Sequence, residues 1–247
     1  MVPGPGSASG EYATPMSELF DDFVRQYQAW FATPLGRIIL KLERELVLGM
    51  LAPQPGETIL DAGCGTGIFT APVLAAGAAV VGLELSGPML ARARATLPVE
   101  AFRPLRGDLT RLPLAEAVFD KALSVTALEF IADGQAAMRE LFRVTRPGGR
   151  VVVATLNSLS PWAQRRRQAG REGHPLFKDV HFRSPAELAA LAPVPGRVAT
   201  AIHFAKDADP DQALASEAAG RARGLASGAF LVGCWDKPRQ GATRVTV

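Results

Sequence analysis

Runs of consecutive apolar residues alternate with segments of helical periodicity through most of the chain. The apolar runs predict seven strands, at residues 58–61, 79–84, 99–106, 119–126, 150–155, 197–204 and 229–235. Helical spacing of apolar residues predicts helices at residues 68–76, 88–95, 134–144, 184–191 and 211–223. Strands that are apolar throughout and alternate with helices are typical of a parallel sheet covered on both faces. The pattern therefore predicts an α/β fold.

The start of the chain has a different pattern. Residues 1–13 include a stretch rich in Gly, Pro and Ser, and we expect them to form a disordered leader. Two further helices are predicted at 17–31 and 34–51, where apolar residues recur at helical spacing. Pro53 and Pro55 are expected to end the second of them.

Composition narrows the class of protein. The chain has 247 residues, of which 48% are hydrophobic and 21% charged, so general disorder is excluded. Its two cysteines match no zinc pattern and cannot staple a fold of this size, so no metal site is expected. The net charge is +3 with basic residues spread along the chain, which makes nucleic-acid binding unlikely as a main function. We find no signal peptide and no membrane span, and expect a soluble, cytoplasmic protein.

A glycine loop follows the first predicted strand. Gly63, Gly65 and Gly67 stand where that strand turns into a helix, and glycine lets the backbone approach a ligand closely. A nicotinamide dinucleotide fingerprint would need a third glycine at position 68, which is Ile68. Asp61 would also repel phosphates. The loop instead suits a ligand with a cationic, amino-acid-like end and a nucleoside.

Acidic residues end the next two predicted strands. Glu84 closes the second strand, where a carboxylate can accept both hydroxyls of a ribose. Asp108 closes the third, where it can accept from an adenine amino group. The carboxyl ends of parallel strands line one crevice, so Asp61, Glu84 and Asp108 are expected to meet there.

The run from Asp61 to Gly67 resembles the signature loop of class I S-adenosylmethionine-dependent methyltransferases. The resemblance continues through Glu84, residues 107–109, Phe119 with Asp120, and residues 146–150. It is strongest over residues 55–156 and most similar to the methyltransferase type 11 branch, which contains quinone-biosynthesis enzymes. It implies a Rossmann-like sheet in strand order 3-2-1-4-5-7-6, with strand 7 antiparallel and helices on both faces.

The resemblance also implies a cofactor, S-adenosylmethionine, and its product, S-adenosylhomocysteine. The glycines would face the methionine part, Glu84 the ribose, Asp108 and Leu109 the adenine, and a carbonyl of Val125 or Thr126 the amino end. The implied cofactor-binding residues are Asp61, Gly63, Cys64, Gly65, Gly67, Glu84, Leu85, Asp108, Leu109, Val125, Thr126 and Tyr27. Near Tyr27 the chain departs from the family, because Gln28 stands where an aspartate is frequent.

Two segments are candidates for the substrate side. N-terminal helices commonly form a lid in this fold, so the resemblance implies a lid at 14–52 ahead of a cofactor-binding domain at 53–247. Within that domain, the insertion at 157–183 is polar, Arg-rich and aromatic, and it is too long for a plain connection. We expect it to border the substrate.

Catalytic residues are harder to predict. A methyl group on a sulfonium is already electrophilic, so alignment supplies much of the rate and no catalytic residue is obligatory. A hydroxyl or carbon acid would need a general base, for which the candidates are His181, Glu129 and His174. Each has a structural alternative, as a surface histidine or a helix-start carboxylate. His203 lies within a predicted strand and is expected to be structural.

Arg165, Arg166, Arg167 and Arg171 form the densest basic run. They could bind an anionic substrate, phosphate head groups or RNA, although a solvated helix face is favoured. We expect an enzyme that methylates a small molecule and is a monomer or homodimer. The alternatives are an RNA or other macromolecular methyltransferase, and a non-catalytic protein that keeps the cofactor pocket for binding or assembly.

Overall fold

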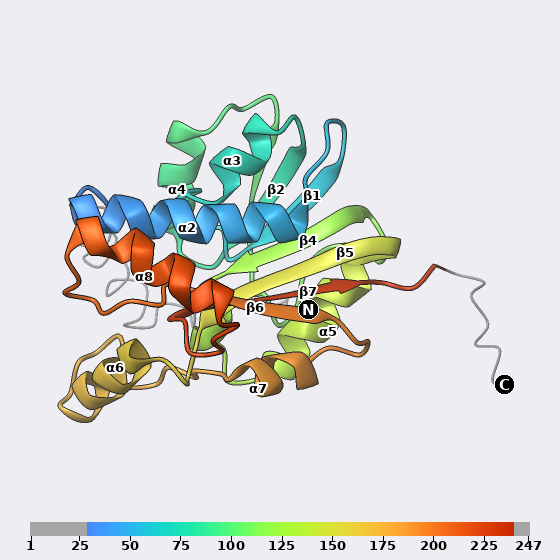
Figure 1. The fold of residues 1–247 in the computed structure, drawn as a ribbon. Coiled ribbons are helices and arrows are strands. Elements are labelled where there is room, and N and C mark those ends of the chain that lie inside the picture. Colours follow the sequence, from blue (N-terminus) through green and yellow to red (C-terminus); the bar gives the residue numbers. More distant parts are fainter. Residues whose placement is uncertain (1–28, 240–247) are drawn as a thin grey trace, which may run out of the picture.

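Seven strands form one sheet in the order β3-β2-β1-β4-β5-β7-β6 (Figure 1). The computed structural model describes residues 29–239. The strands are β1 (Thr58–Ala62), β2 (Ala79–Glu84), β3 (Phe102–Arg106), β4 (Phe119–Val125), β5 (Thr145–Leu156), β6 (Arg197–Ala201) and β7 (Phe230–Asp236). β1 to β5 pair in parallel, whereas β7 runs antiparallel to both β5 and β6. The predicted strand order is confirmed, and the predicted leader and Tyr27 lie outside the described residues.

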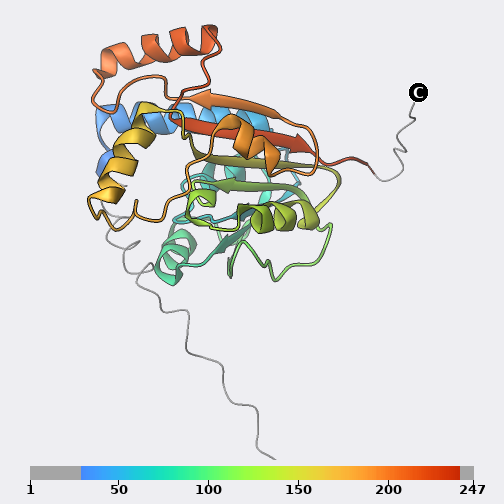
Figure 2. The same ribbon diagram turned by 90° about the horizontal axis from the view of Figure 1, so that it is seen from below.

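Helices cover both faces of this sheet. One face carries α2 (Pro34–Leu51), α3 (Thr70–Ala75), α4 (Gly87–Thr96) and α8 (Pro210–Ala222), and the other carries α5 (Gly134–Val144) and α7 (Pro185–Ala190) (Figures 1 and 2). Side chains alternate between the two faces along each strand. On β5, Val152 and Ala154 pack toward α2, while Val151 and Val153 pack toward α5. Both faces are therefore apolar, which explains the continuous apolar runs in the sequence.

α2 is a core helix. Ile39, Leu42, Val47 and Leu51 are buried, and the helix contacts β5, β6 and β7 as well as α3 and α8. Residues 34–51 belong to the range in which we expected a lid, but this apolar face packs on the sheet instead. The lid itself stays a prediction.

The insertion at 157–183 contains α6 (Pro161–Arg171), a helix that the sequence reading did not predict. Its start signals are nevertheless present, because the Ser160 hydroxyl accepts from the Ala163 N–H and Pro161 occupies the first turn. α6 lies beyond the carboxyl ends of the parallel strands, at the left of Figure 1. It is placed where a helix could border a ligand in the crevice.

Two strands are shorter than predicted. β6 ends at Ala201 because Ile202 adopts a φ of 65°, which a strand cannot accommodate. β3 begins at Phe102 rather than at residue 99, since the Phe102 N–H bonds the Pro98 carbonyl in a turn.

Candidate cofactor crevice

The glycine loop between β1 and α3 is held by backbone hydrogen bonds. The N–H groups of Gly63 and Cys64 both donate to the Leu83 carbonyl of β2, at 2.7 and 3.0 Å. Gly63, Gly65 and Gly67 have φ angles of 80°, 55° and 84°, which L side chains rarely adopt. A Cβ on Gly63 would also lie 2.4 Å from the Ala127 Cβ. The loop conformation thus requires glycine.

The Glu84 carboxylate joins this loop to the end of β2. Its Oε2 accepts from the Gly65 N–H at 3.0 Å, and its Oε1 accepts from the Ser86 N–H at 2.9 Å. Each carboxylate oxygen can accept a second hydrogen bond. Glu84 is thus fixed at the crevice with acceptor capacity left for two hydroxyl groups.

Asp61 lies beneath the loop rather than on its surface. Its side chain is 2% exposed, and the Thr70 hydroxyl of α3 donates to its Oδ2 at 2.6 Å. Burial raises the pKa of Asp61 to about 7, and the nearby Glu84 charge adds to this effect. A cation bound at the loop would favour the ionised form of Asp61.

An apolar and an acidic side chain stand at the rim. Leu85 is 56% exposed, which is unusual for leucine, and it follows Glu84 directly. Asp108 is exposed, and its Oδ1 accepts from both the N–H and the hydroxyl of Thr110, at 2.8 Å each. Leu109 is buried beneath it. An exposed leucine beside an acidic acceptor suits the face and the amino edge of a purine ring.

The end of β4 closes the crevice on the other side of β1. Thr126 has a φ of 48°, and its N–H donates to the Ala154 carbonyl at 2.9 Å. Val125 is buried, and Ala127 lies against Gly63. Cys64 is also buried and packs beside Gly82 of β2, and burial raises the pKa of its thiol.

The structure separates the candidate bases. Glu129 is fully buried in the short helix η1 (Leu128–Phe130), where its Oε2 accepts from the Thr155 hydroxyl at 3.0 Å. Burial raises the pKa of Glu129 to about 7. The side chain of His181 is exposed, although its N–H donates to the Glu129 carbonyl at 2.8 Å. His174 is exposed and stacks on Phe177.

His203 is held in a buried network. Its Nδ1 lies 2.9 Å from Glu217 Oε2, and its Nε2 lies 3.1 Å from the Thr200 hydroxyl. The Arg221 guanidinium completes the network by donating to Glu217. The network joins α8 to the end of β6, which agrees with the expected structural role of His203.

The arginines of α6 point in different directions. Arg165 pairs with Asp207 at 3.3 Å and is exposed. The Arg166 guanidinium carbon lies 5.5 Å from the Trp162 ring centroid, and that of Arg167 lies 5.4 Å from the Phe182 centroid. The sequence favoured the interpretation that the basic run of α6 forms one solvated helix face. That interpretation is wrong, since Arg166 and Arg167 are half-buried over aromatic rings.

One buried acidic residue was not singled out from the sequence. Glu43 is 8% exposed on the sheet-facing side of α2, and burial raises its pKa to about 8. It stands four residues from Ile39 and four from Val47, both buried. An acidic residue at helical spacing within the apolar face of the predicted helix is the sequence signal that could have identified Glu43.

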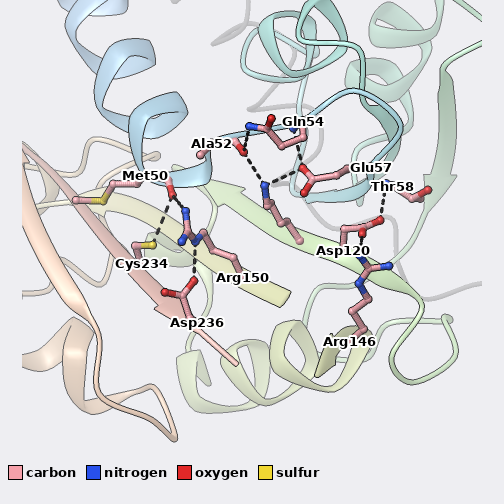
Figure 3. Close-up of polar contacts among 11 residues, drawn as sticks. Met50, Ala52, Gln54, Glu57, Thr58, Asp120, Arg146, Arg150, Cys234 and Asp236 are labelled. Carbon is pink, nitrogen blue, oxygen red and sulfur yellow. Dashed lines mark hydrogen bonds and ion pairs between the residues drawn. The ribbon is translucent and has the colours of Figure 1, made fainter. Parts of the chain in front are cut away.

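A polar cavity of about 300 Å³ lies at the opposite edge of the sheet (Figure 3). Lys121 Nζ donates to the Ala52 carbonyl and to Glu57, at 2.6 and 2.7 Å. Arg150 donates to the Met50 carbonyl at 3.0 Å and pairs with Asp236. These cations bond carbonyls at the C-terminal end of α2, where intrahelical donors run out, and the Cys234 thiol also donates to the Met50 carbonyl at 3.6 Å. The lining charges thus have a structural function.

Within residues 29–239, no helix is long and apolar enough to cross a bilayer. The same part of the chain contains no group of three His, Cys, Asp or Glu side chains placed to hold a metal ion.

The sheet order, the glycine loop and its acidic partner define the class I S-adenosylmethionine-dependent methyltransferase fold. Residues 60–153 match the family described as "Methyltransferase domain". Residues 60–153 thus carry a methyltransferase domain, and the fold of the chain is that of S-adenosylmethionine-dependent methyltransferases.

Curated relatives share this domain. A demethylmenaquinone methyltransferase of Beutenbergia cavernae is 38% identical over 145 residues, which is 59% of each chain. A malonyl-[acyl-carrier protein] O-methyltransferase of Serratia marcescens is 41% identical over 112 residues, covering 45% of this chain and 43% of the relative. The chain thus spans about half the length of these relatives.

Solved structures extend the similarity of fold. A possible histamine N-methyltransferase of Thermotoga maritima superposes with a TM-score of 0.69 at 24% identity, covering 90% of this chain and 99% of that one. A methyltransferase of Mesorhizobium loti gives 0.58 at 25% identity, covering 79% and 98%.

Proposed function

We propose that the protein transfers a methyl group from S-adenosylmethionine to a small-molecule acceptor. The observation that supports this most is the Glu84 carboxylate, which bonds Gly65 of the glycine loop and keeps acceptor capacity at the crevice. The family match supports the same chemistry over residues 60–153.

The residues of the crevice fit each part of this cofactor. Gly65 leaves room for the methionine part, because nothing lies closer than 3.9 Å to a Cβ placed on it, and Gly63 and Gly67 would face the same part through their backbone. Glu84 would accept from the ribose hydroxyls, and the exposed Leu85 and Asp108 would contact the adenine. A backbone carbonyl of Val125 or Thr126 would accept from the amino group of the cofactor's methionine part. The buried Asp61 lies beneath the same loop.

The chain's own contribution is to align two reactants and to exclude water. The bound cofactor supplies an electrophilic methyl group on a sulfonium. The glycine loop and Glu84 would orient it, and α6, which lies beyond the carboxyl ends of the parallel strands, would help to exclude water. Positioning of this kind can supply most of the acceleration of a displacement reaction.

The acceptor is proposed to be a small molecule rather than RNA. The basic run of α6 motivated the RNA alternative, but Arg166 and Arg167 stack on aromatic rings and do not form one exposed basic surface with Arg165. That arrangement removes the feature expected of a nucleic-acid surface.

A turnover assay tests this proposal. Purified protein is incubated with S-adenosylmethionine and a panel of phenols, amines, thiols and carboxylic acids, and S-adenosylhomocysteine is quantified. We expect acceptor-dependent formation of S-adenosylhomocysteine that Glu84→Ala abolishes. Cofactor binding without turnover on any acceptor would instead favour the non-catalytic binding protein.

A further inference from the structure

Two buried carboxyl groups near the crevice each keep one oxygen without a hydrogen-bond donor. Glu129 is fully buried and uses Oε2 to accept from Thr155, whereas its Oε1 has no partner. Glu43 is 8% exposed, and its Oε2 has no partner either. A buried acceptor without a donor is costly, so such atoms in a folded protein call for an explanation.

These carboxyl groups come from different elements and belong to one cluster. Glu43 is on α2 and Glu129 is on η1, and Arg166 of α6 is near enough to both for its charge to lower the pKa of each, against the larger effect of burial. Arg166 lies 5.5 Å from the Trp162 ring and 5.9 Å from the Phe177 ring. The cluster therefore has an aromatic side formed by the insertion.

Arg183 bounds the cluster on the η1 side. It donates to the carbonyls of Leu128 and Ile131, at 2.9 and 3.3 Å. The Arg183 guanidinium thus donates to backbone carbonyls. It places a positive charge near Glu129 but donates no hydrogen bond to Glu129 Oε1.

The cluster is next to the proposed methyl donor. Glu129 is two residues after Ala127, and Ala127 lies against Gly63 of the glycine loop. A ligand that reaches Glu129 from the crevice would thus approach the place where the methionine part of the cofactor is proposed to bind. The unpartnered oxygen atoms mark that side of the crevice as the acceptor side.

We propose that Glu129 and Glu43 form the acceptor subsite, and that it takes an acceptor whose methyl-receiving atom carries a hydrogen, as a hydroxyl or an amine. This inference rests on the proposed function. Glu129 Oε1 accepts the hydrogen bond and then the proton: the O–H or N–H bond breaks, an Oε1–H bond forms, and the electron pair stays on the acceptor atom. Glu43 is a positioning residue that contacts the same ligand through Oε2.

A carboxylate acceptor does not fit this subsite. Above about pH 8, where Glu129 and Glu43 are both ionised, it brings no hydrogen-bond donor to either vacant oxygen, and its charge faces two carboxylates. The subsite thus differs from what a malonyl acceptor, as named for the Serratia marcescens relative, would require.

Proton acceptance by Glu129 predicts a pH profile. The groups that face it are Glu43 from α2, Arg166 from α6 and Arg183 ahead of α7. Because burial raises the pKa of Glu129 to about 7, the ionised base accumulates as the pH rises through that value. Turnover of a hydroxyl acceptor should rise with it, and Glu129→Gln should remove the rise while leaving KM within about threefold.

Calorimetric titration at about pH 9, with protein saturated with S-adenosylhomocysteine, tests the subsite directly, because Glu43 and Glu129 are then both ionised. The probes are phenol, benzylamine and benzoate, which share a ring and differ in their polar group. We expect phenol or benzylamine to bind at least about tenfold more tightly than benzoate. The ratio of the affinities for phenol and benzylamine then shows whether a hydroxyl or an amine is preferred. Glu129→Leu, which removes the acceptor oxygens, should weaken that binding at least about tenfold.

Glu217→Gln is the matched control, because Glu217 is equally buried but fully paired with His203 and Arg221. Its folded form should bind the probe as the parent protein does. Benzoate binding as tightly as the protic probes, binding of neither protic probe, or unchanged binding in Glu129→Leu would each overturn the inference. If S-adenosylhomocysteine itself does not bind, the proposed function fails instead.

Discussion

The Glu84 carboxylate accepts a hydrogen bond from the Gly65 backbone N–H at 3.0 Å, which ties the glycine loop after β1 to the end of β2. β1 and β2 are neighbours in the sheet, so the two halves of the crevice are fixed relative to each other before any ligand binds. Preorganisation of this kind lowers the entropy lost on binding. Glu84 thus has two roles, as a loop anchor and as a hydroxyl acceptor.

Replacement of Glu84 should affect ligand affinity more than stability. Hydrogen bonds to a charged group contribute about 1.5–3 kcal/mol each, so loss of both ribose contacts in Glu84→Ala should weaken S-adenosylhomocysteine binding by about 100- to 10,000-fold. Calorimetric titration measures this change. Glu100→Gln, at an exposed position, should leave the affinity unchanged. An affinity within twofold of the parent in Glu84→Ala would remove Glu84 from the site.

Two glycine substitutions separate backbone strain from steric clash. Gly63 and Gly56 have φ angles of 80° and 82°, but only at Gly63 would a Cβ meet another atom, the Ala127 Cβ at 2.4 Å. Gly56→Ala should cost about 1 kcal/mol of unfolding free energy from strain alone. Gly63→Ala should cost about 1–3 kcal/mol more and lose cofactor binding. Urea denaturation measures both, and equal losses would contradict the contact with Ala127.

The buried carboxyl of Glu43 should make stability depend on pH. Its pKa is raised to about 8 by burial, so the folded protein holds a proton there that the unfolded chain releases near its ordinary value of 4.5. The unfolded state therefore binds fewer protons between these values, and the contribution of Glu43 to stability falls as the pH rises from about 4.5 to 8. Glu43→Gln, which cannot ionise, should be more stable than the parent, by a margin that grows over this range.

Urea denaturation at pH 5, 6, 7 and 8 measures the margin. Glu45→Gln on the same helix is the control, since Glu45 is half exposed and pairs only with Lys41. It should follow the parent at each pH. A margin for Glu43→Gln that stays constant or shrinks with rising pH would mean that Glu43 ionises normally.

The cavity in Figure 3 should matter for stability alone. Lys121→Met removes the donor to the Ala52 carbonyl and leaves Glu57 without its partner, at side chains that are only 12% and 19% exposed. Breaking a largely buried pair should cost about 2–4 kcal/mol. The remaining folded protein should bind S-adenosylhomocysteine within twofold of the parent. Loss of binding without loss of stability would make this cavity a functional site.

The sheet was predictable from the sequence because its signals are local. The apolar run at 58–61 and the three glycines after it fix a strand and a turn without reference to distant residues. Strand ends were less predictable. β6 stops where Ile202 takes a positive φ, and the next residue, His203, donates its N–H to Glu217 of α8, a contact between distant parts of the chain.

The substrate side was less predictable because it is made by long-range contacts. Glu43, Glu129 and Arg166 stand on three elements, and no local pattern brings them together. Arg166 belongs to a basic run that looks solvated in sequence, yet the fold turns it over Trp162. The apolar stripe of α2 predicts a packed face, but it does not say which surface that face covers.

Titration of the parent protein with S-adenosylhomocysteine and, separately, with NAD tests the central claim most directly. The crevice described here predicts that S-adenosylhomocysteine binds at one site per chain and that NAD does not bind. Binding of NAD without S-adenosylhomocysteine would contradict the account, because the glycine loop would then hold a pyrophosphate above Asp61.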